Sequence, residues 1–133
     1  MNAMTAPAPS ALHRLLIVDD SMVVRHRIMR LCSEARLQNI AIVGQASNGA
    51  QALTLAHETS PTLVTMDLTM PELDGEECIG QLSEMLPEAR ILVVSALSDK
   101  VTALRAISRG AHGFIHKPFR DVEIVNALIE LTE

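Results

Sequence analysis

Short apolar segments alternate with longer helical patterns along this chain, and the alternation constrains the fold more than any other feature. The apolar segments, rich in β-branched residues, span 15–18, 40–45, 63–66, 91–94 and 113–116. Helical patterns cover 21–35, 49–57, 76–85, 99–108 and 121–131. Five strand–helix repeats in this order imply parallel strands with helices on both faces of the sheet. The sequence therefore predicts a doubly wound α/β fold built on a five-stranded parallel sheet.

Apolar spacing and capping residues support these helices. The residues at helical spacing are Val24, Ile28, Leu31 and Ala35 in the first helix, and Val101, Leu104 and Ile107 in the fourth. Asn48 precedes the second helix, Ser98 or Asp99 precedes the fourth, and Gly110 follows the fourth. These residue types are preferred at helix ends.

Length and composition fit one domain. The chain has 133 residues, 48% of them hydrophobic and 20% charged, which is enough for a substantial core. No apolar stretch approaches the roughly 18–20 residues of a membrane span, and the Ala/Pro-rich start lacks the features of a signal peptide. Cys32 and Cys78 have no metal-ligand spacing, so we interpret them as reduced core thiols. We expect a flexible tail at 1–13 and a cytoplasmic domain at 14–133.

The charge is unevenly distributed. The net charge of −5 argues against direct nucleic-acid binding, which needs a basic surface. Between residues 98 and 120, however, five basic residues stand against one acidic residue, a local charge of +4: Lys100, Arg105, Arg109, Lys117 and Arg120 against Asp99. This sector suggests either a face for an acidic partner or an ordinary solvated surface.

Charged and hydroxyl residues follow four of the predicted strands. Asp19 and Asp20 come directly after 15–18, and Asp67 directly after 63–66. Ser95 and Lys117 end two later strands. Because ligands of open α/β sheets bind outside the carboxyl ends of the strands, we expect these side chains to meet at one edge.

Such a group of side chains suits metal and phosphoryl chemistry. Crowded carboxylates raise one another's pKa unless a cation compensates, and a few oxygen ligands favour Mg²⁺. A carboxylate can act as a nucleophile and form an aspartyl phosphate. Lys117 would attract phosphoryl oxygens, and Ser95 could donate a hydrogen bond to one. Taken singly, Asp20 or Ser21 could simply cap a helix, and Ser95 could bond locally to the backbone.

Several motifs together resemble those of response-regulator receiver domains of the CheY-like kind. They are Leu16-Ile17-Val18-Asp19-Asp20-Ser21, Asp67 followed by Met70-Pro71 and Asp74-Gly75, Ser95-Ala96, and Lys117-Pro118-Phe119. The resemblance covers the chain apart from its tail. It implies the flavodoxin-like (βα)5 fold with strand order 2-1-3-4-5.

The resemblance also implies a role for each site residue. Asp67 would be phosphorylated by a sensor histidine kinase. Mg²⁺ would be held by Asp19, Asp20, Asp67 and the backbone carbonyl of Thr69. Lys117, Ser95 and the backbone of Ala96 would stabilise the phosphoryl group. The bond between Lys117 and Pro118 is expected to be cis.

Signalling in the family implies a switch and an output face. Ser95 would couple to Phe114, where many relatives carry Tyr, by a shift in population between existing states. The partner face would comprise the helix at 99–108, the strand at 113–116 and the helix at 121–131, with Lys100, Arg105, Arg109, Phe114 and Arg120. The last helix carries two apolar rows, Val122, Val125 and Ile129, and Ile124, Leu128 and Leu131. One row suits the core, and an exposed row often marks a partner or dimer surface.

The leading hypothesis is a stand-alone receiver, a phosphorylation-operated binding switch and not an enzyme beyond its own phosphotransfer and dephosphorylation. It would bind a kinase and a downstream protein, with chemotaxis as one pathway, as a monomer or a phosphorylation-dependent dimer. An alternative is the receiver part of a longer DNA-binding response regulator. An aspartyl-nucleophile phosphatase is disfavoured, because Thr69 stands where haloacid-dehalogenase-type enzymes carry a second Asp. Flavin binding is disfavoured because Asp19 and Asp20 would repel a phosphate.

Overall fold

A computed structural model describes residues 12–70, 73–97 and 99–133. The strands are β1 (His13–Val18), β2 (Ile40–Ala46), β3 (Leu63–Met66), β4 (Arg90–Ser95) and β5 (Gly113–His116). The helices are α1 (Met22–Leu31), α2 (Gly49–Thr59), α3 (Gly75–Met85), α4 (Lys100–Arg109) and α5 (Asp121–Thr132), with a 3₁₀ helix η1 (Ala35–Leu37) after α1. Most of the predicted tail, Pro71 and Ser98 lie outside the described residues.

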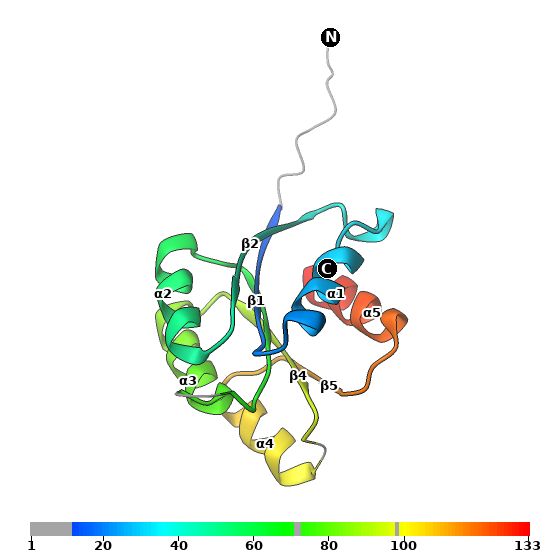
Figure 1. The fold of residues 1–133 in the computed structure, drawn as a ribbon. Coiled ribbons are helices and arrows are strands. Elements are labelled where there is room, and N and C mark those ends of the chain that lie inside the picture. The colour runs from blue at the N-terminus through cyan, green and yellow to red at the C-terminus, as the bar shows by residue number, and fades with distance from the viewer. Residues whose placement is uncertain (1–11, 71–72, 98) are drawn as a thin grey trace.

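The five strands form one parallel sheet in the order β2-β1-β3-β4-β5, which confirms the predicted fold class and strand order. Helices α2, α3 and α4 cover one face, and α1 and α5 cover the other (Figure 1). The strand order reverses between β1 and β3, since chain connections run outward in opposite directions from these neighbours. In open α/β sheets, ligands bind outside the carboxyl ends of the strands at such a switch point.

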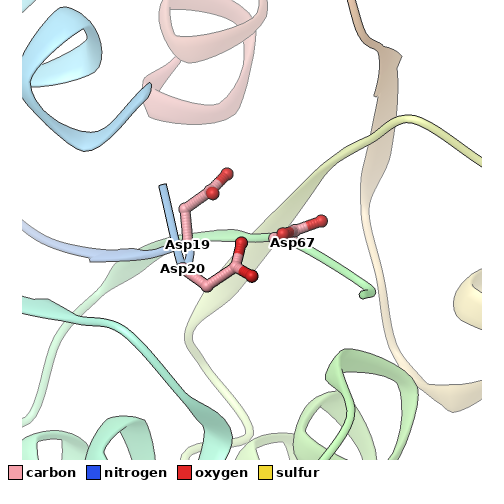
Figure 2. A group of neighbouring side chains, drawn as sticks. All are labelled: Asp19, Asp20 and Asp67. Atoms are coloured by element: carbon pink, nitrogen blue, oxygen red, sulfur yellow. The ribbon is translucent and has the colours of Figure 1, made fainter. Parts of the chain in front are cut away.

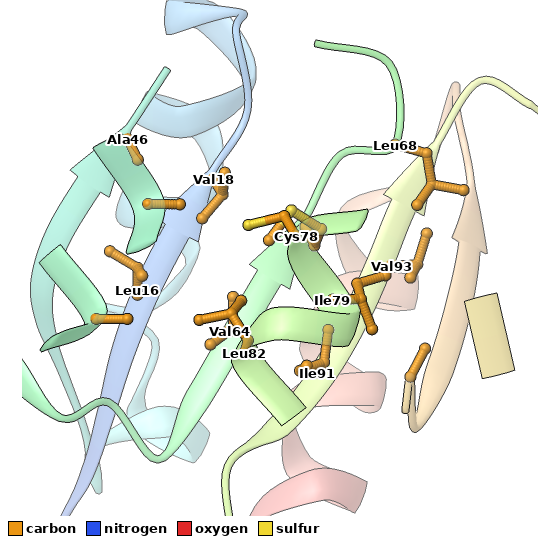
Figure 3. Close-up of a cluster of buried hydrophobic side chains, with 14 of the residues drawn as sticks. Leu16, Val18, Ala46, Val64, Leu68, Cys78, Ile79, Leu82, Ile91 and Val93 are labelled. Carbon is orange, nitrogen blue, oxygen red and sulfur yellow. The ribbon is translucent and has the colours of Figure 1, made fainter. Parts of the chain in front are cut away.

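Two aliphatic clusters hold the helices to the sheet. Alternate strand residues point to opposite faces, so Leu16 and Val64 pack under α2 and α3 (Figure 3), whereas Leu15 packs under α1 and α5. Both cysteines are free and buried, and burial raises the pKa of the Cys32 thiol to about 11 and that of Cys78 to about 12. Both thiols therefore stay protonated near neutral pH.

The first helix is shorter than predicted. It ends at Leu31, and the separate 3₁₀ turn η1 follows. The Ser33 hydroxyl donates to the carbonyl of Arg30 at 2.7 Å and so competes with continued helix. The break lets Leu37 become fully buried under α5, a contact that a straight helix to residue 35 would not make.

Helix α4 buries a different face from the one its apolar spacing indicates. Its buried residues are Thr102 and Ala106, while Val101, Leu104 and Ile107 are 59%, 63% and 53% exposed. The predicted N-cap Asp99 and C-terminal Gly110 are confirmed. We refer to Val101, Leu104 and Ile107 below as the α4 apolar row.

Helix α5 behaves in the opposite way. Ile124, Val125 and Leu128 are all at most 1% exposed, and members of both predicted rows thus belong to the core. Val122 is the large apolar residue of α5 that remains exposed, at 41%. Within the described residues, no helix has both the length and the apolar character needed to cross a membrane.

Candidate functional site

Three carboxylates converge at the carboxyl edge of the sheet. Asp19 and Asp20 follow β1, and Asp67 follows β3, the neighbouring strand (Figure 2). One oxygen of each lies within 4.8 Å of the others. Asp19 and Asp67 are only 2% and 4% exposed, whereas Asp20 is exposed. The structure therefore brings together the three acids that the sequence predicted as one site.

Hydrogen bonds hold the loop that carries Asp19 and Asp20. The Asp19 N–H donates to the carbonyl of Ala46 at 3.0 Å, and the Asp19 Oδ1 accepts from the Ser21 N–H at 2.9 Å. Ser21 itself caps α1, because its hydroxyl accepts from the N–H of Val24 at 3.3 Å. The helix-cap role thus falls to Ser21, and Asp20 is left facing solvent.

Asp67 sits where β3 turns into the loop before α3. Its N–H donates to the carbonyl of Val18 at 2.9 Å, and its Oδ1 accepts from the Thr69 N–H at 3.3 Å. Gly75 begins α3 so close to this loop that a Cβ there would lie 2.1 Å from the Asp67 carbonyl oxygen. Any side chain at this position would have to displace the loop, so the close approach explains the glycine.

Lys117 supplies positive charge from the end of β5. Its Nζ lies 2.8 Å from the Oδ2 of Asp19 and 3.8 Å from the Oδ2 of Asp67. The backbone N–H of Lys117 donates to the carbonyl of Ser95 at 2.8 Å, and the peptide bond between Lys117 and Pro118 is cis. The lysine bonds chiefly to Asp19, so its positive charge offsets the negative charge of Asp67 only in part.

Asp67 is the electrostatically strained member of the site. Burial, reinforced by the negative charge of Asp19, raises the pKa of its carboxyl to about 6. Lys117 and the N–H of Thr69 oppose that rise but do not cancel it. A divalent cation among the three carboxylates would favour the ionised form.

Ser95 and Phe114 lie on β4 and β5, the next two strands of the sheet after β3. Ser95 ends β4 fully buried, and its hydroxyl accepts from the N–H of Leu97 at 3.1 Å. The local bonding considered as an alternative for this serine is therefore present. Phe114, on the neighbouring strand β5, is half-buried and packs against the core cluster beneath α2, α3 and α4.

The basic sector is less positive in three dimensions than in sequence. Arg105 lies 3.1 Å from Glu76, and Arg109 lies 3.3 Å from Glu77, both on α3. Arg120 also pairs with Glu123. Counting charge along the chain missed Glu76 and Glu77, because α3 comes much earlier in sequence and is brought beside α4 only by folding.

Sequence reasoning also missed the residues that support the acids. Arg25 on α1 donates to the backbone carbonyl of Asp19 at 2.7 Å and to the side chain of Gln45 on β2 at 3.2 Å. An arginine in the first turns of a helix carries no sign of such contacts. From the sequence, Gly75 was recognised only as part of the Asp74-Gly75 turn motif, and its close approach to Asp67 was not predicted.

Comparison with known proteins assigns the family. The family model of the response regulator receiver domain matches residues 15–129. The chain is 36% identical to the chemotaxis protein CheY of Thermotoga maritima and 39% identical to that of Bacillus subtilis. These matches cover 90% and 87% of this chain and 98% and 94% of those proteins.

Two further similarities bear on the function. The nitrate/nitrite response regulator protein NarL of Escherichia coli K12 is 34% identical over 86% of this chain, but the match spans 52% of NarL. A chain in the crystal structure of the CheX–CheY–BeF3–Mg²⁺ complex from Borrelia burgdorferi matches with a TM-score of 0.81 and 26% identity. That match covers 90% of this chain and 88% of the other.

This chain belongs to the response-regulator receiver domains and is CheY-like. Receiver domains are signalling switches that bind Mg²⁺ at an acidic pocket and interact with histidine kinases and downstream partners. The cluster of Asp19, Asp20 and Asp67 fits such an ion, because all three offer hard oxygen ligands within a few ångströms.

Proposed function

We propose that Asp67 accepts a phosphoryl group from a sensor histidine kinase and that phosphorylation switches the binding of a downstream protein. The observation that carries the proposal is the buried Asp67 carboxylate beside Asp19, Asp20 and Lys117. Mg²⁺ would be held by the three carboxylates and the Thr69 backbone carbonyl, and when bound it would neutralise charge on the phosphoryl oxygens.

The transfer itself needs an ionised Asp67. A carboxylate oxygen of Asp67 forms a bond to phosphorus while the bond from phosphorus to the kinase imidazole nitrogen breaks. Lys117, 3.8 Å from Asp67, would pair with a phosphoryl oxygen once its contact with Asp19 loosens. In the metal-free protein the pKa of about 6 leaves most of Asp67 ionised at pH 7, and bound Mg²⁺ would favour the ionised form further.

Ser95 and Ala96 would bind the transferred group. A hydroxyl that accepts a hydrogen bond can still donate its own proton, so Ser95 can accept from Leu97 and donate to the phosphoryl group. The Ala96 N–H would be a second donor. Movement of Ser95 toward the phosphoryl group would open space for Phe114 to turn inward, which would couple the site to α4 and β5.

The α4–β5–α5 face would bind the downstream protein. Two of the arginines predicted for this face, Arg105 and Arg109, are paired with acids on α3, which favours the solvated-surface interpretation of the basic sector. What the face offers instead is the α4 apolar row, with each side chain more than half exposed. We infer that an apolar surface of the partner, flanked by polar groups, docks there.

Phosphate-affinity gel electrophoresis after treatment with acetyl phosphate and MgCl2 tests the acceptor. Wild type should give a retarded band that is absent in Asp67→Ala. Asp74→Asn is a matched control, since Asn retains the N-cap of α3 and the residue lies outside the acidic cluster. An equal band in Asp67→Ala, or none in wild type, would refute the proposal.

Capture of partners with and without beryllofluoride tests the output face. A protein that is retained only by the activated form should be lost in Leu104→Gln. Met85→Gln, a comparable change of an exposed apolar residue at the end of α3, should retain it. Equal loss in both variants, or retention in both, would argue against the α4 apolar row.

A chemotaxis receiver and the receiver part of a DNA-binding regulator each have support. Matches to two CheY proteins extend over nearly their whole lengths, which favours the first. The match to half of NarL favours the second. Immunoblotting of the native organism tests the second: a band near 14.4 kDa would exclude a longer regulator, and a much heavier band would support one.

A further inference from the structure

Arg25 connects the acidic loop to the edge of the sheet. Its Nη1 donates to the backbone carbonyl of Asp19 at 2.7 Å, while its Nε donates to the Oε1 of Gln45 at 3.2 Å. Gln45 belongs to β2, the edge strand, and pairs in register with Ile17 of β1. One half-buried guanidinium therefore joins three elements: α1, β2 and the loop between β1 and α1.

This contact acts on the backbone between two of the acids. The carbonyl of Asp19 belongs to the peptide group that leads into Asp20. The orientation of this peptide group therefore sets the position from which the Asp20 side chain extends. The N–H and the carboxylate of Asp19 are already held by Ala46, Ser21 and Lys117. Asp20 is exposed and depends on its backbone for its position.

We propose that Arg25 is a positioning residue for the metal: together with Gln45 it holds the Asp19–Asp20 backbone in the arrangement that binds Mg²⁺. The proposal rests on the Mg²⁺ site proposed above. Arg25 would not touch the ion. It would act through Asp19, as residues behind metal ligands do when they fix ligand orientation, and loss of such contacts typically weakens binding about tenfold or more.

Charge and geometry predict opposite effects of removing Arg25. A cation beside an acidic pocket repels Mg²⁺, so a purely electrostatic residue would give tighter binding when replaced by alanine. A positioning residue would give weaker binding, because the loop gains freedom that the ion must then remove. The sign of the change therefore separates the two roles.

Calorimetric titration of the folded protein with MgCl2 is the test, for wild type, Arg25→Ala, Arg25→Lys and Gln45→Ala. We expect affinity to fall about tenfold in Arg25→Ala. Arg25→Lys should be weakened as well, because lysine keeps the charge but not the two-pronged geometry. Gln45→Ala should lose about two- to threefold, since the Arg25–Asp19 bond remains while its anchor on β2 is lost.

Arg27→Ala is the matched control for general loss of structure. Arg27 lies on the same helix and also bonds one backbone carbonyl, that of Phe119 at 2.8 Å, and one side chain, Asp121 at 2.7 Å. It touches neither acid of the β1–α1 loop. We expect Arg27→Ala to lower the urea midpoint about as much as Arg25→Ala does, with Mg²⁺ affinity within twofold of wild type.

Unchanged or tighter Mg²⁺ binding in folded Arg25→Ala would overturn the positioning role, as would wild-type affinity in Arg25→Lys. An equal loss of affinity in Arg27→Ala would also overturn it, by showing a general effect of destabilising α1. Failure of the proposed function looks different: wild type itself would then bind no Mg²⁺ or show no phosphorylation at Asp67.

Discussion

Helices α5 and α4 both carry rows of apolar residues but place them in opposite environments. Helix α5 buries Ile124 and Leu128 completely, whereas α4 contacts the core through Thr102 and Ala106 and exposes its apolar row. The carboxyl edge of the sheet also departs from the usual burial of apolar groups, since it buries the charged Asp67. Burial on the α5 side stabilises the fold, whereas the exposed apolar row of α4 contributes little to the core and is the surface that we propose binds a partner.

Truncation of one leucine in each helix should give the largest contrast. Leu128→Ala removes a fully buried side chain and should lower the free energy of unfolding by about 2–5 kcal/mol. Leu104→Ala removes a side chain that is 63% exposed and should change it by less than about 0.5 kcal/mol. Urea unfolding followed by circular dichroism measures both. Similar losses in the two variants would remove the distinction between the helices.

Asp67→Asn should stabilise the metal-free protein, by about 2 kcal/mol at pH 7.5. The folded-state pKa is raised from 3.8 to about 6, so the folded protein binds this proton more tightly than the unfolded chain does. Stability from the protonated carboxyl is complete below pH 3.8 and is lost as the pH rises through about 6.

The gain from Asp67→Asn should therefore shrink as the pH is lowered and be nearly absent below pH 4. Urea unfolding in EDTA at several pH values measures this trend. Asp74→Asn, a change at the exposed cap of α3, should show no such dependence. A gain that persists unchanged at pH 4 would show that buried charge is not its cause.

Thr65→Val tests the core beneath α1 and α5, where Thr65 is a buried polar residue among apolar ones. Within the described residues, the Thr65 hydroxyl is buried without a hydrogen-bond partner. It lies between Ile17 and Leu92 on the face covered by α1 and α5. Replacing it with a methyl group should stabilise the fold by about 1 kcal/mol, measured by thermal unfolding. Destabilisation would indicate that a bound water satisfies the hydroxyl.

Neutralising the ion pairs between α3 and α4 should have the smallest effect. The double change Glu76→Gln and Glu77→Gln removes the acids paired with Arg105 and Arg109, whose side chains are about half exposed. Exposed pairs of this kind contribute little, so we expect a loss below about 1 kcal/mol that disappears in 1 M NaCl. A larger loss, insensitive to salt, would mean that these pairs hold α4 as firmly as burial holds α5.

The strands, the helices and the acidic residues at the strand ends could be predicted because the sequence patterns that indicate them involve neighbouring residues. The strand segments at 63–66 and 113–116 match β3 and β5, since a short, mainly apolar run beside turn residues can be recognised from neighbouring residues alone. The convergence of Asp19 and Asp67 followed from one rule, that parallel strands end at a common edge. The role of each residue in phosphoryl transfer came from resemblance to the family.

The features that the sequence did not predict depend on contacts between residues that are distant in the chain. Apolar spacing in α4 identifies a helix with an apolar face but does not say whether that face meets a sheet or solvent. The end of α1 at Leu31 depends on a site for Leu37 in the α1–α5 core. Likewise, the charge of Arg105 is offset by Glu76, which only folding brings near.

By itself, the sequence determined a five-stranded parallel α/β fold with acids at its carboxyl edge, because periodicity and strand ends are properties of neighbouring residues. Tertiary structure alone decided that Lys117 bonds to Asp19, that Arg25 holds the acidic loop, and that the α4 apolar row faces outward. Each of these depends on distances between elements, which packing sets and local sequence does not encode.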